Sequence, residues 1–174
     1  MKNLFLVVDS NILLRSPGFI QELGREPGVI IVVPRAVVEE LKKAADLERL
    51  KKLRAGPQNG EVKKWSKTIA LALKRWPLVQ EKIRNGEWKV RGSYRQRIVP
   101  KLFIEVRRLG LKSISITDIR VVATAIALKN GGEGKVKLLS LDREVVKLAR
   151  CMHIYVPPIH GWEKHFWKNE ILDY

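Results

Sequence analysis

The sequence predicts an α/β protein with three α/β/α layers around a central parallel sheet. Three short apolar runs carry this prediction, residues 4–8, 29–33 and 136–141, and a segment with helical spacing follows each of them. Runs of this length that are rich in Val, Ile and Leu are typical of strands buried on both faces of a parallel sheet. At 174 residues, the chain is long enough for one domain with a full hydrophobic core.

The first part of the chain alternates between strand and helix patterns. Residues 11–23 predict one or two short helical turns, broken at Ser16-Pro17-Gly18. After the second strand, Pro34 suits the first turn of a helix, and we expect that helix to run from Arg35 to about Arg54. Its apolar positions recur at helical spacing, which places Glu40 beside the buried stripe and near the sheet.

Residues 46–110 form a basic, mainly helical insertion within a single domain that covers residues 1–174. We expect helices over 61–84, with Pro77 forcing a kink or a new start, and over 98–109, and a short strand or arm over 87–91. This segment holds 18 Lys and Arg against 6 Asp and Glu, so it carries 12 of the 16 net positive charges of the chain. Such an excess predicts an anionic partner, most simply a nucleic acid.

The last third returns to alternating helices and strands. A helix over 118–129 is entered through Ser115-Ile116-Thr117, and the strand over 136–141 ends at Asp142. We expect a further helix over 143–152, a strand over 154–156 and a closing helix over 161–172. Three aromatic residues of that last helix suit packing on the sheet or a homo-oligomer contact: Trp162, Phe166 and Trp167.

Composition excludes several classes of protein. The single Cys151 rules out a disulfide framework and a cysteine-based zinc site, and it suits a reducing compartment. No run reaches the roughly 18 apolar residues that a membrane span requires, and Asp9 interrupts the apolar N-terminus too early for a signal peptide. We therefore expect a cytoplasmic protein without a membrane partner.

Four acidic residues fall at equivalent places in this pattern. Asp9 and Asp142 follow strands, Asp118 lies in the first turn of a helix, and Glu40 lies on the helix after the second strand. Ligands of open α/β sheets bind beyond the carboxyl ends of the strands, so these acids are candidates for chemistry. Capping of the following helix is the alternative for each of them, and for Asp9 the two interpretations are about even.

Four carboxylates that converge on one crevice would repel one another unless a cation lies between them. Hard oxygen ligands favour Mg²⁺ or Mn²⁺. Such ions lower the pKa of a bound water, align it with a phosphodiester and neutralise the charge on the leaving oxygen. The pattern therefore predicts a metal-dependent phosphodiesterase site.

The segments VVDSNIL, VVPRAVVEEL, SITDIRVVATAI and LLSLDREV resemble, in order, the four motifs of the PIN-domain nucleases. The resemblance implies that Asp9, Glu40, Asp118 and Asp142 form the catalytic, metal-binding set, and that Asn11, Thr117 and Ser140 orient it. It also implies an endoribonuclease dependent on Mg²⁺ or Mn²⁺ that leaves 5′-phosphate and 3′-hydroxyl ends. Such an enzyme would act either as a toxin, with an antitoxin-like protein partner, or in RNA processing.

Two alternatives stay open beside this function. The long basic insertion resembles that of the PIN-type protein-only RNase P group, which matures tRNA 5′ ends, although Arg120 and Val122 stand where that group carries additional aspartates. A catalytically silent RNA-binding scaffold is the non-enzymatic alternative.

The insertion supplies the candidate contacts to RNA. A positively charged wall could follow a phosphate backbone while Trp88 or Tyr94 stacks an unpaired base. Trp65, Trp76 and Phe103 are instead expected to be core or oligomer contacts, because they recur at helical spacing. The predicted RNA-binding residues are Lys63, Lys64, Lys67, Arg91, Arg95, Arg97, Arg107 and Arg108.

Overall fold

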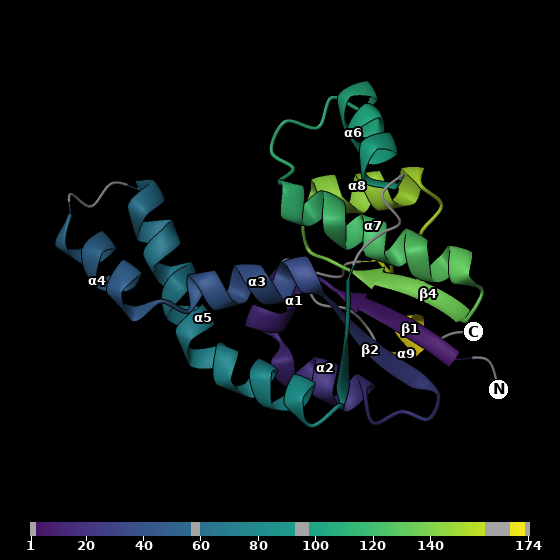
Figure 1. Ribbon diagram of the computed structural model, residues 1–174, viewed down its shortest axis with the longest axis horizontal. Coiled ribbons are helices and arrows are strands. Elements are labelled where there is room, and N and C mark those ends of the chain that lie inside the picture. Colours follow the sequence, from purple (N-terminus) through teal and green to yellow (C-terminus); the bar gives the residue numbers. More distant parts are fainter. Residues whose placement is uncertain (1–2, 57–59, 93–97, 159–167, 173–174) are drawn as a thin grey trace.

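The computed structural model describes residues 3–56, 60–92, 98–158 and 168–172. In these residues the strands form one parallel sheet in the order β3-β2-β1-β4, with helices around it (Figure 1). The strands are β1 (Asn3–Val8), β2 (Val29–Pro34), β3 (Trp88–Arg91) and β4 (Gly134–Leu139). The predicted α/β class and the central parallel sheet are confirmed.

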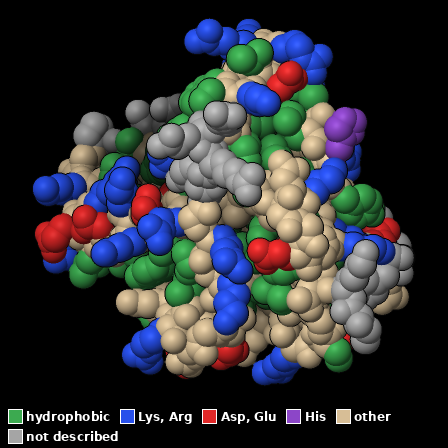
Figure 2. Space-filling model, turned by 45° about the vertical axis from the view of Figure 1, so that its right-hand side comes forward, with side chains coloured by type: hydrophobic (Ala, Val, Ile, Leu, Met, Phe, Trp, Pro, Cys, Tyr) green, Lys and Arg blue, Asp and Glu red, His purple; other side chains and the backbone are tan. Residues whose placement is uncertain are grey.

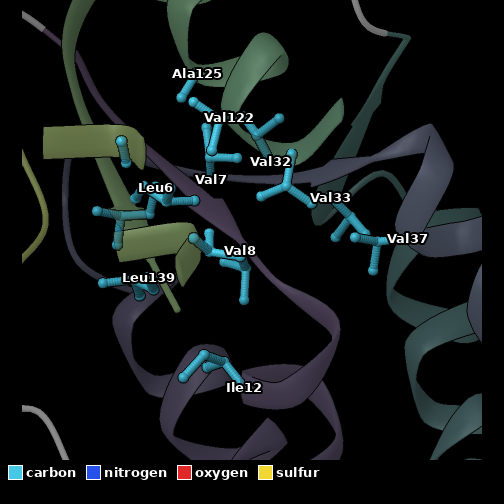
Figure 3. Packing of buried hydrophobic residues seen from close by; sticks show 14 of the residues in the cluster. Leu6, Val7, Val8, Ile12, Val32, Val33, Val37, Val122, Ala125 and Leu139 are labelled. Atoms are coloured by element: carbon cyan, nitrogen blue, oxygen red, sulfur yellow. The ribbon is translucent and has the colours of Figure 1, made fainter. Parts of the chain in front are cut away.

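The two middle strands are buried along most of their length. In β1, residues 4–8 are all buried, and Val7 pairs with Val32 of β2 while Val8 pairs with Leu139 of β4. Apolar side chains on both faces of a strand need cover on both sides, which explains the layers. Figure 3 shows Val7 close to Val122 of helix α7, whereas Val8 points the other way toward Ile12 of helix α1.

The helices of the described residues connect and cover these strands. Their bounds are α1 (Ser10–Arg15), α2 (Pro17–Leu23), α3 (Arg35–Ala44), α4 (Leu47–Ala55), α5 (Gly60–Arg84), α6 (Ile98–Arg108), α7 (Ile116–Gly131), α8 (Arg143–Cys151) and α9 (Lys168–Leu172). α7 packs on β1, β2 and β4, with α6 and α8 against it, while α2 contacts β2 and α5 contacts β3. Among these helices, each is either too short or too polar to cross a bilayer.

The long helix predicted from Arg35 to Arg54 is two helices. α3 ends at Ala44, and the side chain of Asp46 accepts hydrogen bonds from the backbone N–H groups of Glu48 (3.0 Å) and Arg49 (3.3 Å). An Asp side chain that caps a new helix competes with continuation of the old one. The chain therefore starts again at α4, which projects away from the sheet beside α5 (Figure 1).

The basic segment 46–110 is not simply attached to the surface of the domain. β3 pairs with β2 in parallel, with Val33 opposite Val90, and forms an edge of the sheet. Trp88, Ala72 and Val79 are buried in the same hydrophobic core as β1. Pro77 lies inside α5, which runs without interruption from Gly60 to Arg84. The segment therefore supplies part of the core and carries its charge on the outside.

The strand predicted over 154–156 is reduced to a single parallel bridge between Lys137 and Tyr155. The backbone N–H of Leu138 donates to the carbonyl oxygen of Tyr155 at 3.0 Å, a distance typical of paired strands. Pro157 and Pro158 follow directly, and proline cannot donate to a sheet, so the pairing stops. Residues 161–167 of the predicted closing helix, with Trp162, Phe166 and Trp167, lie outside the described residues.

Candidate active site

Asp9 lies where β1 ends and α1 begins, and only 1% of its surface is exposed. Its Oδ1 accepts a hydrogen bond from the backbone N–H of Ser10 at 2.7 Å. Its Oδ2 accepts one from Asn11 Nδ2 at 2.8 Å and one from the Ser140 hydroxyl at 2.6 Å. A buried carboxylate with three donors has a fixed orientation, so the rigid core determines where this group points.

Asn11 and Ser140 also join the ends of two neighbouring strands. Asn11 Oδ1 accepts from the backbone N–H of Leu141 at 3.1 Å, and Ser140 Oγ accepts from the backbone N–H of Asp142 at 3.1 Å. This network links the residues after β1 to those after β4. Both side chains therefore occupy positions that could orient Asp9 as predicted. Thr117 lies elsewhere, on the wall of a pocket that also contains Glu40.

Asp118 and Asp142 lie at the starts of two helices and serve as part of their caps. Asp118 Oδ2 accepts from the backbone N–H of Ser115 at 2.7 Å, and Ser115 Oγ accepts from the backbone N–H of Asp118 at 3.1 Å, a reciprocal capping box for α7. Asp142 Oδ1 accepts from the backbone N–H of Glu144 at 2.7 Å and caps α8. Each carboxylate keeps its second oxygen for other partners.

The surroundings of Asp9 hold its pKa far above that of an ordinary aspartate. Burial, which disfavours the charged form, is the largest cause, and the negative charges of Asp118 and Glu40 add to it. The hydrogen bonds from Ser140 and Ser10 oppose the rise, and the resulting pKa is about 7. The carboxylate is therefore destabilised by residues that the sequence predicts to share its site.

Glu40 and Asp118 experience the same environment. The pKa of Glu40 is raised by partial burial and by the charge of Asp118, against a hydrogen bond from the Ser10 side chain. Partial burial also raises the pKa of Asp118, and the charges of Asp142 and Glu144 add to that rise. The four predicted acids therefore interact electrostatically, although they come from four separate parts of the chain. Glu144, which the sequence reasoning missed, contributes to the same field.

The carboxylate oxygens of the predicted acids are the type of ligand that a hard divalent cation prefers. The carboxylates raise one another's pKa, which is the condition that a bound cation relieves. In the described residues, however, no three His, Cys, Asp or Glu side chains are arranged as a group that could hold a metal ion. The described acids therefore influence one another electrostatically without forming a preassembled set of metal ligands.

A pocket of about 320 Å³ is lined by Glu40 and by Ser10, the residue that follows Asp9. We call it the Trp65 pocket, because Trp65 of α5 forms part of its wall and 57% of this side chain is exposed. The sequence predicted Trp65 to lie in the core or in an oligomer contact; its exposure excludes the core, and the oligomer contact stays a prediction. The pocket is lined by Ser10, Leu14, Ala36, Glu39, Glu40, Leu41, Lys43, Ala44, Arg49, Trp65, Thr68, Ile69, Ile116, Thr117 and Arg120.

Those of the predicted RNA-binding residues that the structure describes lie on two separate helices and one strand. Lys63, Lys64 and Lys67 are exposed near the start of α5, and Arg107 and Arg108 are exposed at the end of α6. Arg108 pairs with Glu105 at 2.7 Å. In the face seen in Figure 2, Lys and Arg side chains clearly outnumber acidic ones.

Other basic and aromatic predictions have mixed outcomes. Arg91 ends β3 and lies 3.8 Å from Glu133. Trp88 is 2% exposed, so it cannot stack on a nucleic-acid base as predicted. Phe103 is 43% exposed on α6, which excludes the core and leaves the alternative prediction of an oligomer contact. Tyr94, Arg95 and Arg97 lie outside the described residues.

The fold and the acids at one edge of the sheet define a class of α/β protein with a candidate hydrolytic site at the carboxyl ends of its strands. A family model described as PIN domain matches residues 6–157, and the chain belongs to the PIN-domain family. PIN domains are generally nucleases and typically use divalent metals, so the chain has a nuclease fold.

One solved structure extends the similarity in shape over nearly the whole chain. It is described as a domain of a functionally unknown protein from Methanocaldococcus jannaschii DSM 2661, with 19% identity and a TM-score of 0.52. The match covers 96% of this chain and 97% of that chain, and it supports the fold alone. No curated protein matches the chain.

Proposed function

We propose that the protein is an endoribonuclease dependent on Mg²⁺ or Mn²⁺ that hydrolyses RNA phosphodiester bonds to 5′-phosphate and 3′-hydroxyl ends. The observation that carries the proposal is Asp9, a buried carboxylate held by Asn11 and Ser140 in the negative field of Glu40 and Asp118. A purely structural acid gains nothing from a pKa raised to about 7, whereas groups with such shifts gather at functional sites.

In this proposal Asp9, Glu40, Asp118 and Asp142 would hold the ion. When bound there, it supplies a water of lowered pKa and neutralises charge on the phosphodiester. The residues of the chain have two tasks. The bonds from Asn11 and Ser140 keep Asp9 oriented, and the N–H groups that cap α8 hold Asp142 at the same edge of the sheet.

RNA is the proposed substrate because of the charge distribution. The chain carries a formal net charge of +16, and 12 of those charges belong to segment 46–110. Lys63, Lys64 and Lys67 lie on α5, the helix that also carries Trp65 next to the acids. A positive surface beside the acids would attract the phosphate backbone toward them. Cys151, the single cysteine, is free and suits activity in the reducing cytoplasm.

A second candidate function is an RNA-binding scaffold without catalysis. It is favoured by the capping bonds of Asp9, Asp118 and Asp142, which give each of these acids a structural role without any metal ion. The scaffold and the enzyme share the basic surface, so RNA binding cannot distinguish them. Cleavage and its dependence on Asp9 can.

The test is to incubate single-stranded RNA, structured RNA and precursor tRNA with Mg²⁺, Mn²⁺ or a chelator. We expect cleavage with either ion, none with the chelator, and a loss of more than about 100-fold in rate for Asp9→Asn, since removing even the partners of a metal ligand costs 10- to 100-fold. Asp46→Asn is the matched control. Asp46 caps α4 as Asp9 caps α1, and asparagine caps equally well.

Three results would change the conclusion. Cleavage that survives the chelator and Asp9→Asn contradicts the proposed site. Tight binding without cleavage, weakened steeply by salt, favours the scaffold. Cleavage of precursor tRNA only at the mature 5′ end identifies the RNase P type of activity.

A further inference from the structure

The Trp65 pocket joins the acid edge of the sheet to the basic segment 46–110. Ser10, Glu40 and Thr117 line it from the side of the sheet. Arg49 of α4 and Trp65 of α5 line it from the other side. α5 packs against both α3 and α4, and Figure 1 shows α4 beyond the end of α3, next to the first part of α5. The pocket is therefore positioned to hold a part of the substrate that lies next to the reacting bond.

Trp65 has the exposure of a binding side chain. Four residues further along α5, Ile69 is 1% exposed and fixes the helix against the domain, while 57% of Trp65 remains in contact with solvent. A large aromatic ring with this exposure offers a flat apolar surface at a fixed position. Nucleobases stack on such rings, and the stacking tolerates any base because each has a π-face.

The volume and polar lining of the pocket fit a nucleobase. About 320 Å³ lies at the small end of the range of ligand sites, large enough for one base with its sugar and too small for a duplex. Ser10, Thr68 and Thr117 supply hydroxyl groups. Thr68 already donates to the carbonyl oxygen of Lys64 at 3.2 Å, and Ser10 bonds to Glu40, so these two hydroxyls would accept from the edge of a base. A base paired in a duplex could not enter, because its edge and both faces are already covered.

The charges around the pocket separate the base from its phosphates. Lys43, Arg49 and Arg120 line the pocket and would attract phosphate groups, whereas Glu39 and Glu40 would repel them. A neutral base is the part of a nucleotide that tolerates both signs. The phosphates of the strand would then lie toward the cations on one side and toward a cation held by the acids on the other.

The pocket begins one residue away from Asp9. The backbone N–H of Ser10 donates to Asp9 Oδ1 at 2.7 Å, and the Ser10 side chain interacts with Glu40. We propose that the Trp65 pocket binds one unpaired nucleobase of a single-stranded RNA, the base that flanks the phosphodiester positioned at the acids. This inference rests on the proposed function for its place along the strand, but stacking on Trp65 can be measured without cleavage.

The experiment measures binding of a short, labelled, single-stranded oligoribonucleotide by fluorescence anisotropy, with a chelator present so that no metal-dependent cleavage occurs. We expect Trp65→Ala to weaken binding about 10- to 100-fold and Trp65→Phe to restore most of it. Phe103→Ala is the matched control, because Phe103 is an exposed aromatic residue on α6 that lies outside the pocket. We expect it to change binding by less than about twofold.

A second measurement asks whether a single base is responsible. The same oligoribonucleotide is prepared with an abasic ribose at each position in turn. One position should lower the affinity of the wild-type protein as much as Trp65→Ala does, and at that position the variant should lose nothing further. This pairing is the signature of one base on one ring.

Two results would overturn the inference: Trp65→Ala binding as tightly as wild type, or equal loss for every abasic position and for duplex RNA. Thermal unfolding of Trp65→Ala checks that a loss of RNA affinity does not come from misfolding. If this variant does not fold, Trp65→Phe provides a second test. Cleavage activity is assayed separately. Stacking on Trp65 without cleavage in the wild type contradicts only the proposed function, and cleavage without stacking contradicts only this inference.

Discussion

The acid edge of the sheet and the basic segment 46–110 are built in opposite ways. Asp9 is 1% exposed and held by three hydrogen bonds, and its pKa is raised by burial and by the other acids. In contrast, Lys63, Lys64 and Lys67 are exposed on the surface of α5. Chemistry needs fixed groups, whereas recognition of a flexible anionic strand needs charge at the surface.

The comparison teaches that electrostatic cost is concentrated where the fold is most rigid. The hydrophobic core around β1 has to compensate for the burial of Asp9 and, to a smaller extent, for the repulsion of the other acids. The basic segment spreads its charges over solvent, where each costs little. Three experiments test this contrast, and they follow from the largest expected effect to the smallest.

The first experiment follows stability against pH in the metal-free protein. Asp9 titrates near 3.8 in the unfolded chain and near 7 in the folded one, so between these values the folded state holds more protons. Stability therefore falls as the pH rises through this window, by about 1.4 kcal/mol per unit and about 4 kcal/mol in all. The raised pKa values of Glu40 and Asp118 act in the same direction.

Urea unfolding at pH 4.5 and pH 7.5 measures this loss of stability. Asp9→Asn should flatten most of the profile, because the amide does not titrate. Added Mg²⁺ or Mn²⁺ should stabilise the wild type far more at pH 7.5 than at pH 4.5. A wild-type profile that is flat, or that keeps its slope in Asp9→Asn, would show that the ionised Asp9 does not destabilise the folded protein.

The second experiment removes the support of Asp9 but not its charge. Ser140→Ala deletes the 2.6 Å hydrogen bond to Asp9 Oδ2, and we expect cleavage to fall about 10- to 100-fold at saturating RNA. Thr124→Ala is the control, because Thr124 is equally buried but donates to the carbonyl oxygen of Arg120 within α7. Equal losses in both variants would mean that burial of a hydroxyl, rather than the orientation of Asp9, matters.

The third experiment compares two basic surfaces. Replacing Lys63, Lys64 and Lys67 by Ala should lower the slope of log affinity against log salt by about 2, and affinity near physiological salt by roughly tenfold, if each contacts a phosphate of a single strand. Replacing Arg107 and Arg108 should change the slope less, because Arg108 is already paired with Glu105. A larger loss from the α6 pair would move the predicted RNA path to that helix.

Much of the site was predictable because its residues follow local signals. A buried apolar run that ends in Asp9, and a Ser115 that caps the helix of Asp118, each reflect a few neighbouring residues. The charges of Glu40 and Asp118 raise the pKa of Asp9, but among the described residues no three acids form a group that could hold a metal ion, so the shared site of the four acids stays a prediction. Their roles as metal ligands stay a prediction, as do those of Asn11, Thr117 and Ser140.

The outcomes for aromatic residues were not predictable in the same way. Trp65 and Trp88 both stand among apolar residues in the sequence, yet Trp65 is 57% exposed and Trp88 is 2% exposed. The difference arises because Trp88 lies on β3, which pairs with β2 and is covered by α5, whereas Trp65 lies near the start of α5, beyond the sheet. Helical spacing says which residues share a face but not what covers that face.

The sequence by itself determined the α/β class, the first two strands, the helix that begins after Ser115 and the acids at their ends. These features depend on the periodicity of apolar residues and on caps, which act within a few residues. Only the tertiary structure decided the order β3-β2-β1-β4 and the pocket that joins Glu40 to Trp65. Those features depend on contacts between segments far apart in the chain, and no local pattern records them.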